Sequence, residues 1–131
     1  MRKTVAASPE RIERYRRGRV SEWVAAAALL AKGYRILARR TRTPYGEIDL
    51  IAVRGRRLAF VEVKRRPTRL EGEAAITPRQ ATRIARAAEF WVSRNKAYRD
   101  HEQGLDVMFV TPNRLPVHVL DALHLGPQTR G

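Results

Sequence analysis

Two neighbouring segments of the chain, Glu47–Val53 and Leu58–Lys64, carry apolar side chains at successive positions rather than only at every second one. Strands that are apolar on both faces are typical of the centre of a sheet that is covered on both sides. Because only Arg54–Arg57 separate the two segments, we expect an antiparallel hairpin. This hairpin restricts the chain to folds in which other elements cover both faces of a sheet.

The register of this hairpin follows from its short loop. A loop of two residues and a loop of four leave the same side chains opposite each other, and apolar positions then meet near the turn. The expected pairs are Val53 with Leu58, Ile51 with Phe60, Asp49 with Glu62, and Glu47 with Lys64. The register therefore predicts two carboxylates side by side, with Cβ atoms about 5 Å apart.

The other elements follow from periodicity, capping residues and turn residues. We expect a helix from about Arg19 to Lys32, ended by Gly33. A second helix is expected after the capping sequence Thr77–Gln80. It runs to about Asn95. Further strands are predicted near Tyr34–Arg40, Leu105–Val110 and Val117–Leu120. This order predicts an α/β sandwich with helices packed on a mixed sheet.

The length of 131 residues is that of one ordinary domain. We expect this domain over residues 15–125, between a basic, flexible N-terminal tail (1–14) and a C-terminal tail (126–131). No apolar run approaches the roughly 20 residues of a membrane span, and charges occupy the first 18 residues, where a signal peptide needs an apolar stretch. The absence of cysteine excludes disulfides and thiolate metal sites. We therefore expect a cytoplasmic protein that does not bind membranes.

Positive charge dominates the composition: 27 Lys and Arg stand against 13 Asp and Glu, which gives a formal charge of +14. Such an excess favours a phosphate-rich partner, that is, nucleic acid. On the second predicted helix, Arg79, Arg83 and Arg86 form a basic stripe. The stripe is compatible with contacts to a phosphate backbone and equally with an ordinary solvated helix face. Trp23 and Trp91 occupy apolar helical positions, and we expect both in the core.

The predicted acid pair is the strongest functional signal. Two carboxylates this close repel each other by roughly 3 to 4 kcal/mol at an effective dielectric constant near 20. A hard divalent cation such as Mg²⁺ reverses the sign, and Asp49 with Glu62 and the backbone carbonyl of Val63 supplies the oxygen ligands it prefers. Lys64, on the same face as Glu62, could stabilise charge that develops on a phosphate. The alternative is a solvated polar face with a Glu47/Lys64 ion pair, but charges inside a covered sheet need a reason.

Several segments together closely resemble the YraN-like family of bacterial proteins, from about Arg17 to Leu123. The matching residues are Glu22, Lys32–Tyr34, Gly46–Ala52, Phe60–Arg65, Arg83–Ala88 and Leu105–Val107. That family looks like a member of the PD-(D/E)XK superfamily, which includes restriction endonucleases and Holliday-junction resolvases. The sequence departs from the superfamily pattern at Ile48, where a proline often precedes the acid, and at Arg79, where relatives often carry Lys or Gln.

The resemblance implies a restriction-endonuclease-like three-layer sandwich with an αβββαβ core. It also implies that Asp49 and Glu62 hold Mg²⁺ or Mn²⁺, that Lys64 is the catalytic lysine, and that Glu22 reaches the metal from the first helix. Arg79 and Gln80 at the start of the second helix would contact phosphate. Asp106 is open to two interpretations, as a residue that orients the site or as a structural acid.

We therefore expect a metal-dependent endonuclease that acts on structured or branched DNA, and a homodimer like the resolvases it resembles. A noncatalytic module that binds DNA or RNA through a vestigial site is the first alternative. The second is a protein-interaction domain whose basic surface meets an acidic partner. Fold alone does not decide between them, because one fold hosts many functions.

Overall fold

The computed structural model describes residues 8–66 and 76–123, without the side chains of residues 13–18. The predicted C-terminal tail (126–131) and residues 1–7 of the predicted N-terminal tail lie outside this described part. Within the described residues, eight elements follow one another. They are α1 (Pro9–Ala31), β1 (Arg35–Thr43), β2 (Gly46–Arg54), β3 (Arg57–Arg65), α2 (Pro78–Arg94), the short 3-10 helix η3 (Lys96–Tyr98), β4 (Glu102–Val110) and β5 (Val117–Val119).

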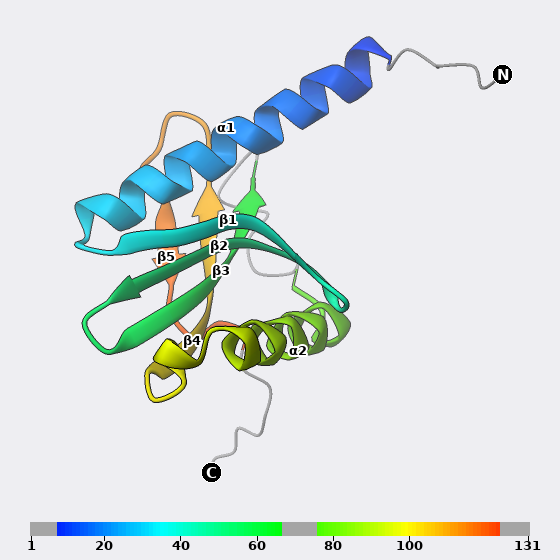
Figure 1. Ribbon diagram of the computed structural model, residues 1–131. Helices are drawn as coiled ribbons and strands as arrows, with labels where there is room; N and C mark the ends of the chain where they lie inside the picture. Colours follow the sequence, from blue (N-terminus) through cyan, green and yellow to red (C-terminus); the bar gives the residue numbers. More distant parts are fainter. Residues whose placement is uncertain (1–7, 67–75, 124–131) are drawn as a thin grey trace, which may run out of the picture.

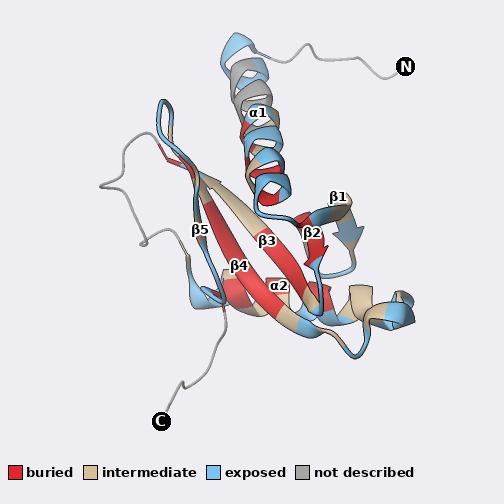
Figure 2. Ribbon diagram, turned by 90° about the vertical axis from the view of Figure 1, so that its left-hand side faces the viewer, coloured by how far each residue is buried: buried red, intermediate tan, exposed pale blue. Residues whose placement is uncertain are grey.

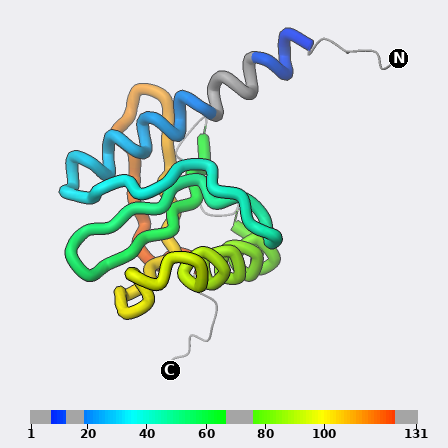
Figure 3. Tube along the Cα trace, viewed as in Figure 1, coloured from blue at the N-terminus to red at the C-terminus, as the bar shows by residue number. Residues whose placement is uncertain are grey.

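The strands form one mixed sheet in the order β1-β2-β3-β4-β5. Only β3 and β4 run parallel, and the other neighbours are antiparallel. A parallel pair needs a long crossover connection, and Figure 3 shows the chain leaving β3, passing through α2 and returning into β4. Helices α1 and α2 lie on opposite sides of the sheet (Figure 1). The predicted three-layer α/β sandwich is confirmed.

Each face of the sheet has its own apolar core. On the α2 side, Ile51 and Phe60 are buried with Ile84 of the helix. On the α1 side, Leu50 and Val61 are buried with Leu29 and other apolar residues of α1. Figure 2 shows the buried residues concentrated along the central strands. The double covering explains why β2 and β3 are apolar at successive positions, as the sequence predicts.

Helix α1 begins at Pro9, ten residues earlier than expected. The Ser8 side chain caps it by accepting a hydrogen bond from the N–H of Arg11 (3.1 Å), and proline suits the first helical position. The helix therefore starts inside the segment expected to be a tail. Helix α2 has the predicted capping box, in which Thr77 and Gln80 exchange hydrogen bonds between side chain and backbone.

The prediction that Trp23 lies in the core is wrong, because its side chain is 55% exposed. Helix α1 packs on the sheet through the buried Ala25, Ala26 and Leu29 and the partly buried Ala28. The side of α1 that carries Trp23 therefore faces solvent. Trp91 packs against the core on the α2 side and contacts the ring of Phe60, with a centroid separation of 5.9 Å.

A buried ion network fixes β5 and the turn that follows it to the sheet. The Asp106 carboxylate is fully buried and accepts two hydrogen bonds from Arg57, each 2.8 Å long. His118 Nε2 lies 2.8 Å from its Oδ2 atom, and the backbone N–H of Asp121 donates to its Oδ1 atom. None of these partners is a predicted site residue, so Asp106 is a structural acid here.

Candidate metal centre and nucleic-acid interface

The predicted register is correct as far as the β2–β3 ladder extends. Val53 faces Leu58 and Ile51 faces Phe60, as expected, and the last pair of the ladder is Leu50 with Val61. The two outer pairs, Asp49 with Glu62 and Glu47 with Lys64, were predicted wrongly as ladder pairs. Instead, the Asp49 side chain bridges the strands, because its Oδ2 atom accepts a hydrogen bond from the N–H of Val63 (2.8 Å).

The end of the ladder is where the predicted acids meet. The pKa of Asp49 is raised to about 7, first by burial and then by the charge of Glu62, with smaller contributions from Glu22 and Glu47. The hydrogen bond from Val63 acts in the opposite direction, because it favours the carboxylate. Two strands and one helix thus bring four acids close enough for one carboxylate to respond to the other three.

Two basic side chains balance part of this negative charge. Lys64 Nζ lies 3.3 Å from Glu62 Oε2, and Arg40 Nη1 lies 3.4 Å from Glu22 Oε1. Both glutamates are largely shielded from solvent, with side chains 12% exposed. Lys64 therefore pairs with Glu62, which is not the Glu47/Lys64 ion pair expected for a merely structural hairpin.

Carboxylate oxygens are the ligands that hard divalent cations prefer, and a partly buried acid with three acidic neighbours gains from such a cation. Asp49, Glu62 and Glu22 therefore fit a divalent cation by donor type and charge. Among residues 8–66 and 76–123, however, no three acids or histidines are already arranged around one point. In the structure Glu62 is paired with Lys64 and Glu22 with Arg40, so a cation would share these carboxylates with the two basic side chains.

The predicted nucleic-acid residues of α2 divide into two groups. Arg79 and Arg86 are exposed and free to meet a phosphate backbone. Gln80 belongs to the capping box, and Arg83 donates a long hydrogen bond (3.4 Å) to the backbone carbonyl of Glu47. The second pair therefore holds the local structure, and Arg83 fastens the β1–β2 turn to α2.

Two arginines have surroundings that the sequence analysis did not predict. Arg40 pairs with Glu22 from a left-handed backbone conformation (φ 53°), which is uncommon for a side chain of this size. Arg66, two positions after Lys64, is buried beside Phe109, and two nitrogens of its guanidinium have no hydrogen-bond partner in the described structure. The positions of Arg40 and Arg66 could not be predicted, because nothing in this arginine-rich sequence distinguishes them from surface arginines.

The mixed sheet between two helices defines an α/β sandwich consistent with a restriction-endonuclease-like fold. The sequence pattern described as "Uncharacterised protein family UPF0102" matches residues 21–110, and the chain belongs to this family. The matched segment includes Glu22, Asp49, Glu62 and Lys64. The predicted resemblance to the YraN-like family is thereby confirmed.

Relatives of similar length support the assignment. A UPF0102 protein of Rhodopseudomonas palustris (strain BisB5) is 48% identical over 120 residues, which cover 92% of each chain. The UPF0102 protein mlr4633 of Mesorhizobium japonicum is 50% identical over 117 residues, covering 89% of this chain and 94% of the relative. Within the described part of the chain, no helix has the length and apolar character needed to cross a membrane.

Neutralising the partly buried Asp49 and neutralising the buried Asp106 should change the free energy of unfolding in opposite directions. The pKa of Asp49 is about 7 in the folded protein against an ordinary 3.8, so its ionisation costs stability as pH rises between these values. We expect Asp49→Asn to raise the free energy of unfolding at pH 8 by roughly 2 to 4 kcal/mol, and the gain to vanish near pH 4. Urea denaturation at both pH values measures this difference.

Asp106→Asn is the matched comparison, because the hydrogen bonds from Arg57, His118 and the Asp121 N–H outweigh burial and hold the pKa of Asp106 far below its ordinary value. Its charge stabilises the fold above that ordinary value and ceases to do so as pH falls through the lowered pKa. At pH 8 we expect a loss of roughly 3 kcal/mol. Equal responses of the two variants would contradict the electrostatic difference between the two sites.

Proposed function

We propose that the protein is a Mg²⁺-dependent endonuclease that hydrolyses phosphodiester bonds in structured or branched DNA. The observation that carries this proposal is that Asp49 lies close enough to Glu62 and Glu22 for their charges to raise its pKa, while Lys64 pairs with Glu62. A structural acid in a sheet is expected to have donors around it, as Asp106 does. Asp49 instead has acidic neighbours, an arrangement that becomes favourable when a cation is bound.

Each residue of the site has a distinct role in this proposal. Asp49 and Glu62, with Glu22 from α1 and the carbonyl of Val63, would hold Mg²⁺ or Mn²⁺. A bound cation would neutralise phosphate charge and lower the pKa of a water molecule. The Val63 N–H fixes the orientation of Asp49 through its hydrogen bond to Oδ2.

Lys64 contributes a compact positive charge next to Glu62. When Glu62 turns toward a cation, the ammonium group is left to stabilise the additional negative charge that develops on the phosphate during attack by water. The exposed Arg79 and Arg86 of α2, together with the net charge of +14, would attract the rest of the nucleic-acid backbone. In this proposal, Lys64 would act in catalysis, whereas Arg79 and Arg86 would contribute to the affinity for nucleic acid.

A cleavage assay on four-way junction, flap and linear DNA tests the proposal. With Mg²⁺ or Mn²⁺ we expect cutting by the wild type and a loss of cleavage rate of at least about 100-fold in Glu62→Gln and Lys64→Met. The first variant removes a metal ligand, and the second removes a positive charge that would stabilise the transition state. Glu102→Gln and Lys96→Met, at exposed positions outside the site, are the matched controls. EDTA should abolish cutting by every active variant.

Two outcomes would overturn the proposed activity. Binding without cutting under either metal would favour the noncatalytic nucleic-acid module. Failure to bind DNA, or binding that hardly changes with salt, would favour the protein-interaction domain, because neutralised phosphates give a slope of about −0.9 per contact in a plot of log affinity against log salt. Cutting that persists in Glu62→Gln would show that the active site lies elsewhere.

We also propose that the protein forms a homodimer through α1. Exposed apolar residues follow one side of this helix, mostly three residues apart: Val20, Trp23, Val24, Ala27 and Leu30. A stripe with this spacing is suited to pairing with another helix, and a second copy supplies the same stripe under two-fold symmetry. Charge repulsion between two chains of +14 opposes this contact, so added salt should favour it.

Sedimentation velocity at low and moderate salt tests the dimer. We expect self-association of the wild type to increase with salt and with protein concentration. Trp23→Glu should weaken it at least about tenfold by burying a charge in the seam, whereas Leu115→Glu, also at an exposed apolar position but outside α1, should not. A wild type that stays monomeric at all salt concentrations would refute the dimer.

A further inference from the structure

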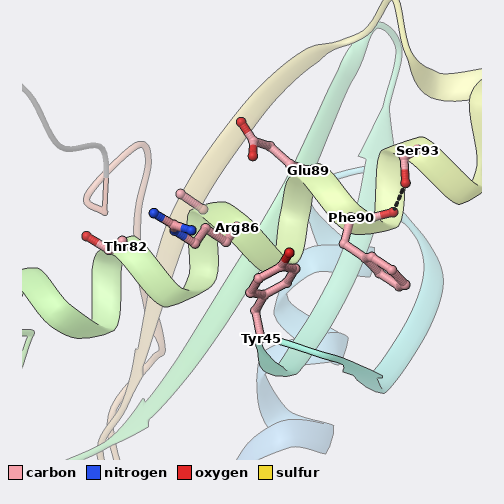
Figure 4. A pocket seen from close by; sticks show the side chains of 7 residues that line it. Tyr45, Thr82, Arg86, Glu89, Phe90 and Ser93 are labelled. Atoms are coloured by element: carbon pink, nitrogen blue, oxygen red, sulfur yellow. Dashed lines mark hydrogen bonds between the residues drawn. The ribbon is translucent and has the colours of Figure 1, made fainter.

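An open pocket of 620 Å³ lies where the β1–β2 turn meets the outer side of α2. Figure 4 shows Tyr45 of the turn in front of the helix, between Arg86 and Phe90, with Glu89 at the border. The lining combines an aromatic ring, a guanidinium and a carboxylate. Its volume is in the range of pockets that hold small organic ligands.

Hydrogen bonds hold the turn in place and thus shape the pocket before any ligand binds. Thr43 Oγ1 accepts a hydrogen bond from the N–H of Tyr45 (3.0 Å) and donates one to the carbonyl of Gly46 (2.7 Å). Gly46 has φ of +126°, and a side chain there would collide with the guanidinium of Arg83. The pocket therefore depends on glycine at this position and on the close approach of Arg83.

Two aromatic side chains of the pocket, Tyr45 and Phe90, contact each other. Phe90 meets Tyr45 edge to face, with centroids 6.4 Å apart, and the guanidinium of Arg94 lies 4.8 Å from the Phe90 ring centre. Tyr45 is 45% exposed. A large exposed aromatic residue on a rigid turn is suited to stack on a planar ligand, and the phenylalanine ring supports it from the side.

We propose that this pocket binds an unpaired nucleobase, so that the substrate class is nucleic acid with a single-stranded segment. The base would stack on Tyr45, as bases stack on aromatic rings in single-strand binders. Arg86 would donate to the adjoining phosphate or to the base, and Glu89 would accept a hydrogen bond from an exocyclic amino group. This inference rests on the proposed function, because it places the pocket on the same nucleic-acid strand as the acid site.

The position of the pocket relative to the acids supports the same ligand. Tyr45 precedes Asp49 by four residues, and β2 begins between them at Gly46. At 3.3 Å per residue this spacing is about 13 Å along the strand, the length of a few nucleotides of one DNA strand. A phosphodiester at Lys64 and a base at Tyr45 can therefore belong to one strand.

The stacking of bases in a duplex explains why the pocket would select unpaired nucleic acid. Inside a continuous duplex each base is stacked on both sides, so no face is available to Tyr45 without unstacking. A flap, a fork or a junction with frayed arms presents such a base at no extra cost. The net charge of +14 attracts any nucleic acid, and the pocket would add the preference between paired and unpaired strands.

Fluorescence anisotropy in EDTA tests the pocket without any cleavage. Labelled single-stranded DNA and a duplex of the same sequence are titrated with wild type, Tyr45→Ala, Tyr45→Phe and Leu115→Ala, the last at an exposed apolar position away from the pocket. We expect Tyr45→Ala to weaken single-strand binding about 5- to 150-fold, the value of one stacked base. Duplex binding should change less than about twofold, and Tyr45→Phe should bind like the wild type.

A 2-aminopurine base in the single strand gives a second readout, because stacking quenches its fluorescence. Wild type and Tyr45→Phe should quench it and Tyr45→Ala should not. Equal single-strand affinity and quenching in wild type and Tyr45→Ala would overturn the proposal, as would an equal loss on duplex and single strand. Because these readouts need no metal, they can support the pocket even if the cleavage assay refutes the nuclease, and the reverse also holds.

Discussion

The pairing of β2 with β3 is the contact on which the rest of the structure depends. Its residues are apolar on both faces, so stability requires a cover on each side, and α1 and α2 provide the two covers. The parallel pairing of β4 with β3 is linked to this covering, because the chain crosses the α2 face of the sheet before it returns as β4. The ladder ends at Leu50 and Val61, and the acids lie at that end. There the N–H of Val63 donates a hydrogen bond to the Asp49 side chain instead of to a backbone carbonyl of β2.

The buried Asp106 and the partly buried Asp49 lie in opposite electrostatic environments. Asp106 is surrounded by donors from Arg57, His118 and the backbone, which outweigh burial and hold its pKa low. Asp49 has one backbone donor, from Val63, and otherwise acidic neighbours, and its pKa is raised to about 7. The first arrangement is complete within the chain and stabilises the fold. The second is costly as it stands, and the proposed cation would remove that cost.

The sequence predicts the elements and the inner register well, because both depend on local patterns: apolar faces, a short loop and the Thr77 capping box. It fails where a tertiary contact decides. Asp49 leaves the ladder pattern to accept the N–H of Val63, and Trp23 is exposed because α1 packs through one side only. The Tyr45 pocket joins two segments about 40 residues apart, a contact that no local pattern of the sequence contains.

The proposed function depends on binding of a divalent cation by the acids at the end of the β2–β3 ladder. Anomalous diffraction from crystals grown with Mn²⁺ tests this binding most directly, because the signal locates the ion without assuming any activity. We expect an anomalous peak bounded by Asp49 and Glu62, with Lys64 turned away from Glu62, and no such peak in Asp49→Asn crystals. Crystals saturated with Mn²⁺ that show no ion there, while Glu62 stays paired with Lys64, would contradict it.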